Sequence, residues 1–257
     1  MRTGKLFFCA MLLVTSIRCD NSNDVITIQD PIPADYPTLI AQGCSDSEPS
    51  HTGVATYYTW ADGGGNCSFD PTPNDLMVGA MNHVDYAGSA VCGSSVAITG
   101  PKGRVTVRIV DQCGDCPQGH IDLSPQAFAR IADIPTGIVP IKWRYVATAV
   151  QGSIIYHFKD GSNQWWTAVQ IRNHRYPVAK FEFMNAQGTF ITVRRRTYNY
   201  FVEPNGMGPG PYTFRVTDIY GHVLTDSGIP HVENGNVAGA NQFPSCSTAS
   251  TDEAKDQ

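Results

Sequence analysis

Charge is scarce in this 257-residue sequence, in which only 16% of the residues are Asp, Glu, Lys or Arg. There is also no heptad pattern, no repeat of about 20–50 residues and no low-complexity core, which argues against coiled coils and repeat arrays. Basic residues are outnumbered 18 to 23, so the formal net charge is −5. An acidic chain is a poor ligand for nucleic acid or an anionic membrane, and we expect neither as a partner.

Long apolar runs are absent except at the N-terminus, where Leu6 to Ile17 follows a basic segment that contains Arg2 and Lys5. The run is too short to span a bilayer and has the flanks of a secretory signal peptide. We therefore expect residues 1–19 to be removed and the mature protein to be secreted, extracellular and free of the membrane. A buried first helix and a lipid anchor at Cys19 are the alternatives.

Turn-forming residues are plentiful, with 24 glycines and 17 prolines. Gly and Pro clusters separate short β-branched runs, a pattern typical of strands. The sequence therefore predicts an all-β protein, with a barrel at 51–149 and a β-sandwich at 153–231. A polar leader at 20–50 and a flexible tail at 232–257 flank them. The clearest predicted strands are Val105–Val110, Ile141–Val146, Val178–Met184, Thr189–Arg194 and Tyr212–Val216.

Six of the eight cysteines lie beyond the N-terminal segment, and an even number in an exported chain predicts disulfides. Cys113 and Cys116 have the spacing of a zinc or redox pair. No second pair and no suitably spaced His follow, and the pair lies in a Gly/Pro-rich loop, so we expect no metal and no cofactor. Asn66 begins an Asn-Cys-Ser motif, which is a weak glycosylation signal. The six are Cys44, Cys67, Cys92, Cys113, Cys116 and Cys246.

Two aspartates flank a loop of ten residues. Asp111 ends a predicted strand, and Asp122 precedes a predicted helix from Ser124 to Ile131, with Ser124 as N-cap and Pro125 at its first position. The loop is long enough to return the chain to the same rim, where paired carboxylates serve glycoside chemistry. The alternative for Asp122 is an acid that caps the helix or braces the loop.

The dipeptide Trp165–Trp166 follows a predicted turn that begins at Lys159. Neighbouring side chains of a strand point to opposite faces, so one indole is expected in the core and the other outside. In one interpretation both indoles are buried or half-buried. In the other, exposed indoles offer flat faces on which sugar rings stack.

Residues 52–231 resemble the two-domain bacterial-type expansins. The resemblance rests on Ala55–Tyr58, Gly100–Gly103 and the segment from Val110 to Ser124 in the first part. In the second part it rests on Trp165–Val178, Tyr198–Val202 and Val216–Gly221. It implies a six-stranded double-psi β-barrel, related to family 45 endoglucanases, followed by an immunoglobulin-like β-sandwich of carbohydrate-binding family 63.

The resemblance also implies the residues of the groove. Positions matching Thr56, Asp111 and Asp122 line a polysaccharide groove in that family, and the aspartate matching Asp122 is required for wall loosening. The endoglucanases carry a second catalytic aspartate on the first strand, where this sequence has no acid. Cys113 stands where some relatives have a groove tyrosine, and Tyr58 is expected to supply that aromatic contact instead.

In the second domain, the matching positions Trp165, Trp166 and Tyr198 form a linear platform for cellulose, with Lys159 along it. The same resemblance implies disulfides Cys67–Cys92 and Cys113–Cys116, and Cys44–Cys246 is the remaining hypothesis. These pairings are expectations from the family.

The predicted function is therefore non-hydrolytic loosening of plant cell-wall polysaccharide by a secreted, monomeric protein. Cellulose is the expected partner, with xyloglucan, pectin and peptidoglycan as further candidates. One alternative is a weak β-glycan-cleaving enzyme, an endoglucanase or lytic transglycosylase that uses Asp122. The other is a carbohydrate-binding protein that does not loosen walls.

Overall fold

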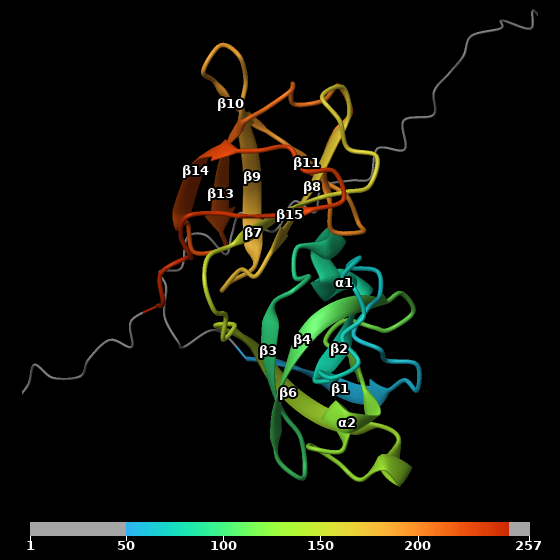
Figure 1. The fold of residues 1–257 in the computed structure, drawn as a ribbon. Coiled ribbons are helices and arrows are strands. Elements are labelled where there is room, and N and C mark those ends of the chain that lie inside the picture. The colour runs from blue at the N-terminus through green and yellow to red at the C-terminus, as the bar shows by residue number, and fades with distance from the viewer. Residues whose placement is uncertain (1–49, 247–257) are drawn as a thin grey trace, which may run out of the picture. The chain divides into compact units, whose positions relative to one another are not determined.

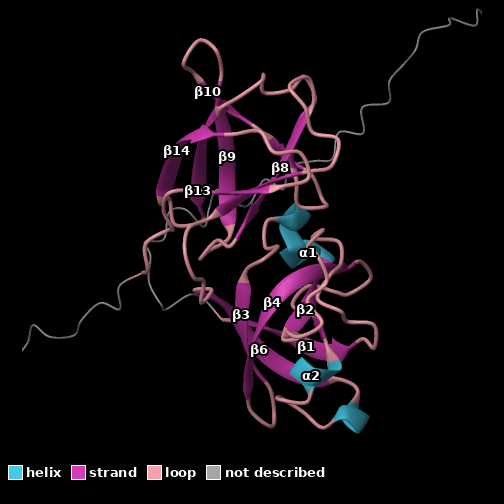
Figure 2. Cartoon of the chain, viewed as in Figure 1, coloured by secondary structure: helices cyan, strands magenta, loops and turns pink. Residues whose placement is uncertain are grey.

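The computed structural model describes residues 50–246. The expected signal peptide, leader and Cys44 lie outside the described residues, as does the end of the chain from 247. Within the described part, strands dominate and helices are short (Figure 2). The helical elements are α1 (His83–Tyr86), α2 (Pro125–Phe128) and the 3-10 turns η2 (Ala87–Ser89) and η3 (Ile134–Thr136).

Six strands close into a barrel in the order β1-β5-β2-β4-β3-β6 (Figure 1). Two pairs, β1 with β5 and β2 with β4, run parallel, and the other neighbours are antiparallel. The closed barrel confirms the predicted fold class. Its strands are β1 (His51–Tyr57), β2 (Val78–Asn82), β3 (Ser95–Thr99), β4 (Arg104–Cys113), β5 (Ile121–Leu123) and β6 (Val139–Val146).

The barrel core follows from the alternation of its strands. In β6, Val139, Ile141 and Trp143 point inward while the residues between them are exposed or half-buried. Trp143 stacks on His51 with ring centroids 4.0 Å apart, and its Nε1–H donates to the Gly119 carbonyl at 3.0 Å. The indole therefore satisfies its polar group while filling the interior.

The predicted helix after Asp122 is present but ends early, since α2 stops at Phe128. Ser124 is its N-cap, as predicted, because its hydroxyl accepts from Ala127 N–H at 3.0 Å. The same hydroxyl donates to the Leu76 carbonyl at 2.5 Å. Ser124 therefore fixes β5 and the start of α2 in one place.

The remaining strands form two sheets that share one apolar core, a sandwich arrangement. The four-stranded sheet has the order β10-β9-β13-β14 and the five-stranded sheet β11-β12-β8-β7-β15. Figure 1 shows these strands in yellow to red. They are β7 (Ile155–Phe158), β8 (Thr167–Arg172), β9 (Val178–Met184), β10 (Phe190–Thr192), β11 (Arg194–Arg195), β12 (Phe201–Glu203), β13 (Tyr212–Asp218), β14 (Val223–Ile229) and β15 (Asn236–Ala238).

Two sequence predictions need correction here. The single strand expected at Thr189–Arg194 is wrong, because β10 and β11 belong to different sheets and the buried Val193 lies where the chain passes between them. The predicted tail also begins too early. β15 pairs with β7, and Phe243 is buried in the sandwich core, so the packed part extends well beyond residue 231.

Disulfides join Cys67 to Cys92 and Cys113 to Cys116, which confirms both family-implied pairings. Cys246 is also disulfide-bonded, and its expected partner Cys44 lies outside the described residues. Neither helix within residues 50–246 has the length and apolar character needed to cross a membrane.

Candidate functional site: a carboxylate groove and an aromatic platform

The parallel pairing of β1 and β5 places Thr56 directly opposite Asp122. The Thr56 hydroxyl donates to Asp122 Oδ1 at 2.5 Å, and the same Oγ1 lies 2.8 Å from His120 Nε2. Because the single hydroxyl proton goes to the carboxylate, His120 must be the donor to Thr56. The result is a directed chain of hydrogen bonds from His120 through Thr56 to Asp122.

His120 is a site residue that the sequence reasoning missed. Burial lowers the pKa of His120, and the nearby charge of Asp122 only partly opposes that shift. The imidazole is therefore neutral near neutral pH and carries one ring N–H, which the geometry assigns to Nε2. His120 directly precedes β5 and lies two residues before Asp122, and this spacing was the signal available in the sequence.

Asp111 is held by backbone donors. Its Oδ1 accepts from Asn66 N–H at 2.7 Å and from Gln112 N–H at 2.8 Å. Gly65 makes this approach possible, since a Cβ built there would lie 2.4 Å from Asp111 Cγ. The loop that follows β1 therefore wraps onto the end of β4 and orients this carboxylate.

Tyr58 lies close enough to Asp111 and Asp122 for their charges to act on its hydroxyl group. Burial raises its pKa, and the charges of Asp111, Asp122 and Asp62 raise it further, in that order. Its hydroxyl is buried and has no hydrogen-bond partner among the described residues. The structure thus brings Thr56, Tyr58, Asp111 and Asp122 together, with Tyr58 half-buried.

Asp122 offers a carboxylate oxygen suited to a sugar hydroxyl. Asp122 Oδ1 is occupied by Thr56, and Oδ2 accepts no hydrogen bond from residues 50–246. Glycoside hydrolysis ordinarily uses two carboxyl groups about 5–9.5 Å apart. β1, His51–Tyr57, carries no acid to serve as the second one. Asp122 Oδ2 can therefore accept a hydrogen bond from a hydroxyl group of a ligand.

The two tryptophans lie in a turn, before β8 begins, so strand alternation does not apply to them. Asn163 Oδ1 accepts from the backbone N–H groups of both Trp165 (2.9 Å) and Trp166 (3.1 Å). Trp165 is 71% exposed, and Trp166 is half-buried. The interpretation in which both indoles are buried is therefore wrong for Trp165.

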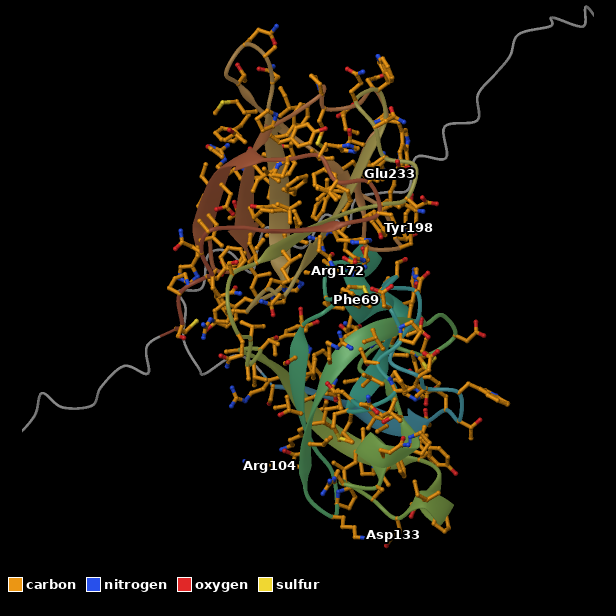
Figure 3. All side chains as sticks on the ribbon, viewed as in Figure 1. Phe69, Arg104, Asp133, Arg172, Tyr198 and Glu233 are labelled. Atoms are coloured by element: carbon orange, nitrogen blue, oxygen red, sulfur yellow. A yellow bond between two sulfur atoms is a disulfide. The ribbon has the colours of Figure 1, made fainter. Side chains whose placement is uncertain are left out.

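Trp166 and Tyr198 rest on a small apolar cluster on the outer face of the five-stranded sheet, formed by Ala168, Tyr200 and Val202. The rings of Tyr198 and Tyr200 are 6.0 Å apart, and Tyr198 is labelled in Figure 3. The Lys159 ammonium lies 5.8 Å from the Tyr200 ring centroid. Trp166, Tyr198 and Lys159 thus gather around one sheet face, and Trp165 lies in the adjoining turn.

The fold and these two surfaces define an all-β protein of the double-psi-barrel class. A family model described as lytic transglycolase, a double-psi barrel domain, matches residues 52–143. The expansin YoaJ of Bacillus subtilis (strain 168) is 40% identical over 204 residues, which span 76% of this chain and 87% of that protein. The chain belongs to the expansin family.

Solved structures agree with this assignment. The apo expansin of Clavibacter michiganensis superposes with a TM-score of 0.71 at 33% identity, covering 76% of this chain and 98% of that one. A single-substitution variant of that expansin, in complex with cellohexaose, matches with the same TM-score at 32% identity and the same coverage. Both structures match across the barrel and the sandwich at an identity that supports more than a shared fold.

Proposed function

We propose that this protein is exported, binds cellulose-type polysaccharide and loosens plant cell walls without hydrolysis. The observation that carries the proposal is the Asp122 carboxylate, oriented by Thr56 and His120 on a barrel whose first strand has no acid. Such a site exchanges hydrogen bonds with a glucan strand. No cofactor is part of the proposal, and the acting form is a monomer with a barrel domain at 51–149 and a sandwich domain from 153.

A contact between the barrel and the sandwich supports joint action of groove and platform. Asn66, whose N–H donates to Asp111, also donates from Nδ2 to the Thr197 carbonyl at 3.1 Å. Tyr86 donates to the same carbonyl at 2.9 Å. Thr197 directly precedes Tyr198 of the platform. One bridging residue therefore links an aspartate of the groove to the chain next to an aromatic of the platform.

The ligand proposed here is a β-linked glucan. The Clavibacter expansin variant was solved with cellohexaose, and stacking on Trp165, Trp166 and Tyr198 suits the flat faces of such a chain. Xyloglucan, pectin and peptidoglycan are the further candidates, to be compared in the same binding assay.

Wall creep tests the groove. Heat-inactivated plant wall strips are held under constant load with wild type, Asp122→Ala or Asp115→Ala, and reducing sugar is assayed in the same bath. Asp115 is an exposed acid of the loop between the two groove aspartates and serves as the matched control. We expect extension by wild type and the control, loss in Asp122→Ala, and no released sugar. Wall extension by Asp122→Ala equal to wild type would contradict the proposal.

The platform is tested by binding to insoluble cellulose. Trp165→Ala removes an exposed indole face and should weaken binding about five- to tenfold, the equivalent of one good aromatic contact. The control is Trp60→Ala, which removes the other strongly exposed tryptophan of the described chain, 91% exposed, on the barrel. Equal losses in the two variants would mean that binding follows surface aromatics in general.

The match to the lytic transglycolase model supports a second candidate, cleavage of a β-linked glycan with Asp122 as the lone acid. The creep experiment separates the two. Soluble sugar or anhydro-sugar released in an Asp122-dependent way would make the protein an enzyme.

A further inference from the structure

A cleft of about 410 Å³ lies away from the groove aspartates. The loop before β2, the turn before β3, the middle of β4, the segment after β6 and the end of β8 meet there. Phe69 and Arg172, two of its lining residues, are labelled in Figure 3. The charged and hydroxyl-bearing residues of its lining include Asp70, Asp75, Arg108, Thr148 and Arg172.

Arg108 has donor capacity that the fold does not use. Its Nη2 donates to Thr72 Oγ1 at 3.1 Å, and the guanidinium lies 5.4 Å from the Phe69 ring centroid. Its Nε–H is buried and finds no acceptor within residues 50–246. An unpaired buried donor of a cation is costly, and a ligand that accepts from it recovers that energy.

Thr148, which lines the same cleft, carries a second unpaired polar atom. Thr148 Oγ1 is buried and has no hydrogen-bond partner in the described chain. Its backbone N–H is occupied by the Arg175 carbonyl at 2.8 Å, so the hydroxyl is the group left over. Two buried polar atoms without a partner, a charged donor and a hydroxyl, thus belong to residues that line one cavity.

The charged side chains of the cleft indicate which class of ligand can bind there. Arg172 is already paired with Asp70, with Nη1 to Oδ2 at 2.9 Å. The charge of Asp75 favours the protonated guanidinium of Arg108, but the described hydrogen bond of Arg108 goes to Thr72. A planar carboxylate matches the Nε and Nη2 edge of a guanidinium. The two aspartates disfavour a compact multivalent anion and accept from hydroxyl groups instead.

We propose that this cleft binds a uronic acid residue, a sugar that carries one carboxylate and several hydroxyls. The carboxylate is held by Arg108 Nε and Nη2, and the Thr148 hydroxyl pairs with the ring. The cavity volume accommodates a single sugar with room for its neighbour. The site is separate from Asp122 and from the tryptophans, so its ligand binding can be tested independently of wall loosening.

The test is an NMR titration of the full chain with glucuronate, with glucose and inorganic phosphate as separate probes. We expect glucuronate to shift the amide signals around Arg108, Thr148 and Arg172, glucose to do so much more weakly, and phosphate to leave them unchanged. Arg108→Gln should weaken the affinity for glucuronate about tenfold or more. Arg104→Gln, an exposed arginine on the same strand, should leave it unchanged.

Thr148→Val removes a hydroxyl that the described fold does not use, so it should fold normally and still bind glucuronate about three- to tenfold more weakly. This variant decides the question if Arg108→Gln proves unstable. Equal shifts with glucose would overturn the carboxylate assignment. Equal shifts with phosphate would overturn the sugar assignment, and glucuronate shifts confined to Trp165 or Asp122 would overturn the site. Asp122→Ala should bind glucuronate like wild type whatever its wall activity.

Discussion

At the scale of single residues, Thr56 is the link on which the groove depends. It accepts from His120 and donates to Asp122, so one hydroxyl fixes both the imidazole and the carboxylate. Removing that hydroxyl leaves a half-buried carboxylate without a donor and an imidazole without its acceptor. The Asp122 side chain then loses its orientation toward the groove.

Thr56→Val is nearly isosteric and should lower the rate of wall extension roughly tenfold, the equivalent of one charge-assisted hydrogen bond. Thr56→Ser should restore it. Thr52→Val, an exposed threonine earlier on β1, is the control, and creep under load is the measurement. If Thr56→Val and Thr52→Val extended walls equally well, the hydrogen-bond chain would have no functional role.

At the scale of elements, the turn that carries Trp165 depends on a glycine from a distant loop. Gly206 has φ +74°, and a Cβ there would lie 2.0 Å from the Gln164 carbonyl oxygen and 2.5 Å from Trp165 Cα. These are backbone atoms, which cannot move out of the way as the end of a flexible side chain could. Only glycine lets the loop after β12 approach the turn this closely.

Gly206→Ala should therefore destabilise the protein by about 3 kcal/mol or more and weaken cellulose binding. The control is Gly188→Ala, which has the same left-handed φ of +75° but open space around it, and which should lose only about 1–2 kcal/mol. Urea unfolding of the two variants measures the difference. Equal losses would mean that φ alone, and not the close approach, sets the requirement for glycine.

The sequence predicted most strands because local patterns define them, as with Val178–Met184, which is β9. It missed β15, because Asn236–Ala238 is short and polar and is a strand only through its pairing with β7. His120 was missed for a related reason. Its role depends on the parallel register of β1 and β5, and no local pattern reveals which distant strand lies alongside. The cleft at Arg108 likewise exists only where five separate segments meet.

At the scale of the whole molecule, His174 couples stability to pH. It is 4% exposed, its Nδ1 donates to the Tyr176 carbonyl at 2.8 Å, and a Cβ on Gly93 of the barrel would lie 2.9 Å from its Nε2. Burial lowers the pKa of His174 to about 4, and the positive charge of Arg195 acts in the same direction. The native protein therefore holds this imidazole neutral.

Between about pH 6.5 and 4 the unfolded chain binds a proton at His174 that the folded chain does not, so stability should fall as the pH is lowered through this window. The contribution is about 3 kcal/mol over the full range. Urea midpoints at pH 7 and pH 4.5 measure it. His174→Asn, which keeps a donor for Tyr176, should reduce this loss, whereas the exposed control His83→Gln should not. An unchanged pH dependence in His174→Asn would assign the effect to other groups.

The closed barrel also sets an order of events during synthesis. β1 is the first barrel strand to be made, yet its neighbours are β5 and β6, and His51 pairs with Trp143 near the end of β6. The nascent chain must therefore emerge to about residue 146 before β1 acquires both partners. Until then its backbone donors and acceptors remain open to other chains. The barrel can close only after synthesis has passed β6, because β6 is the last strand that pairs with β1.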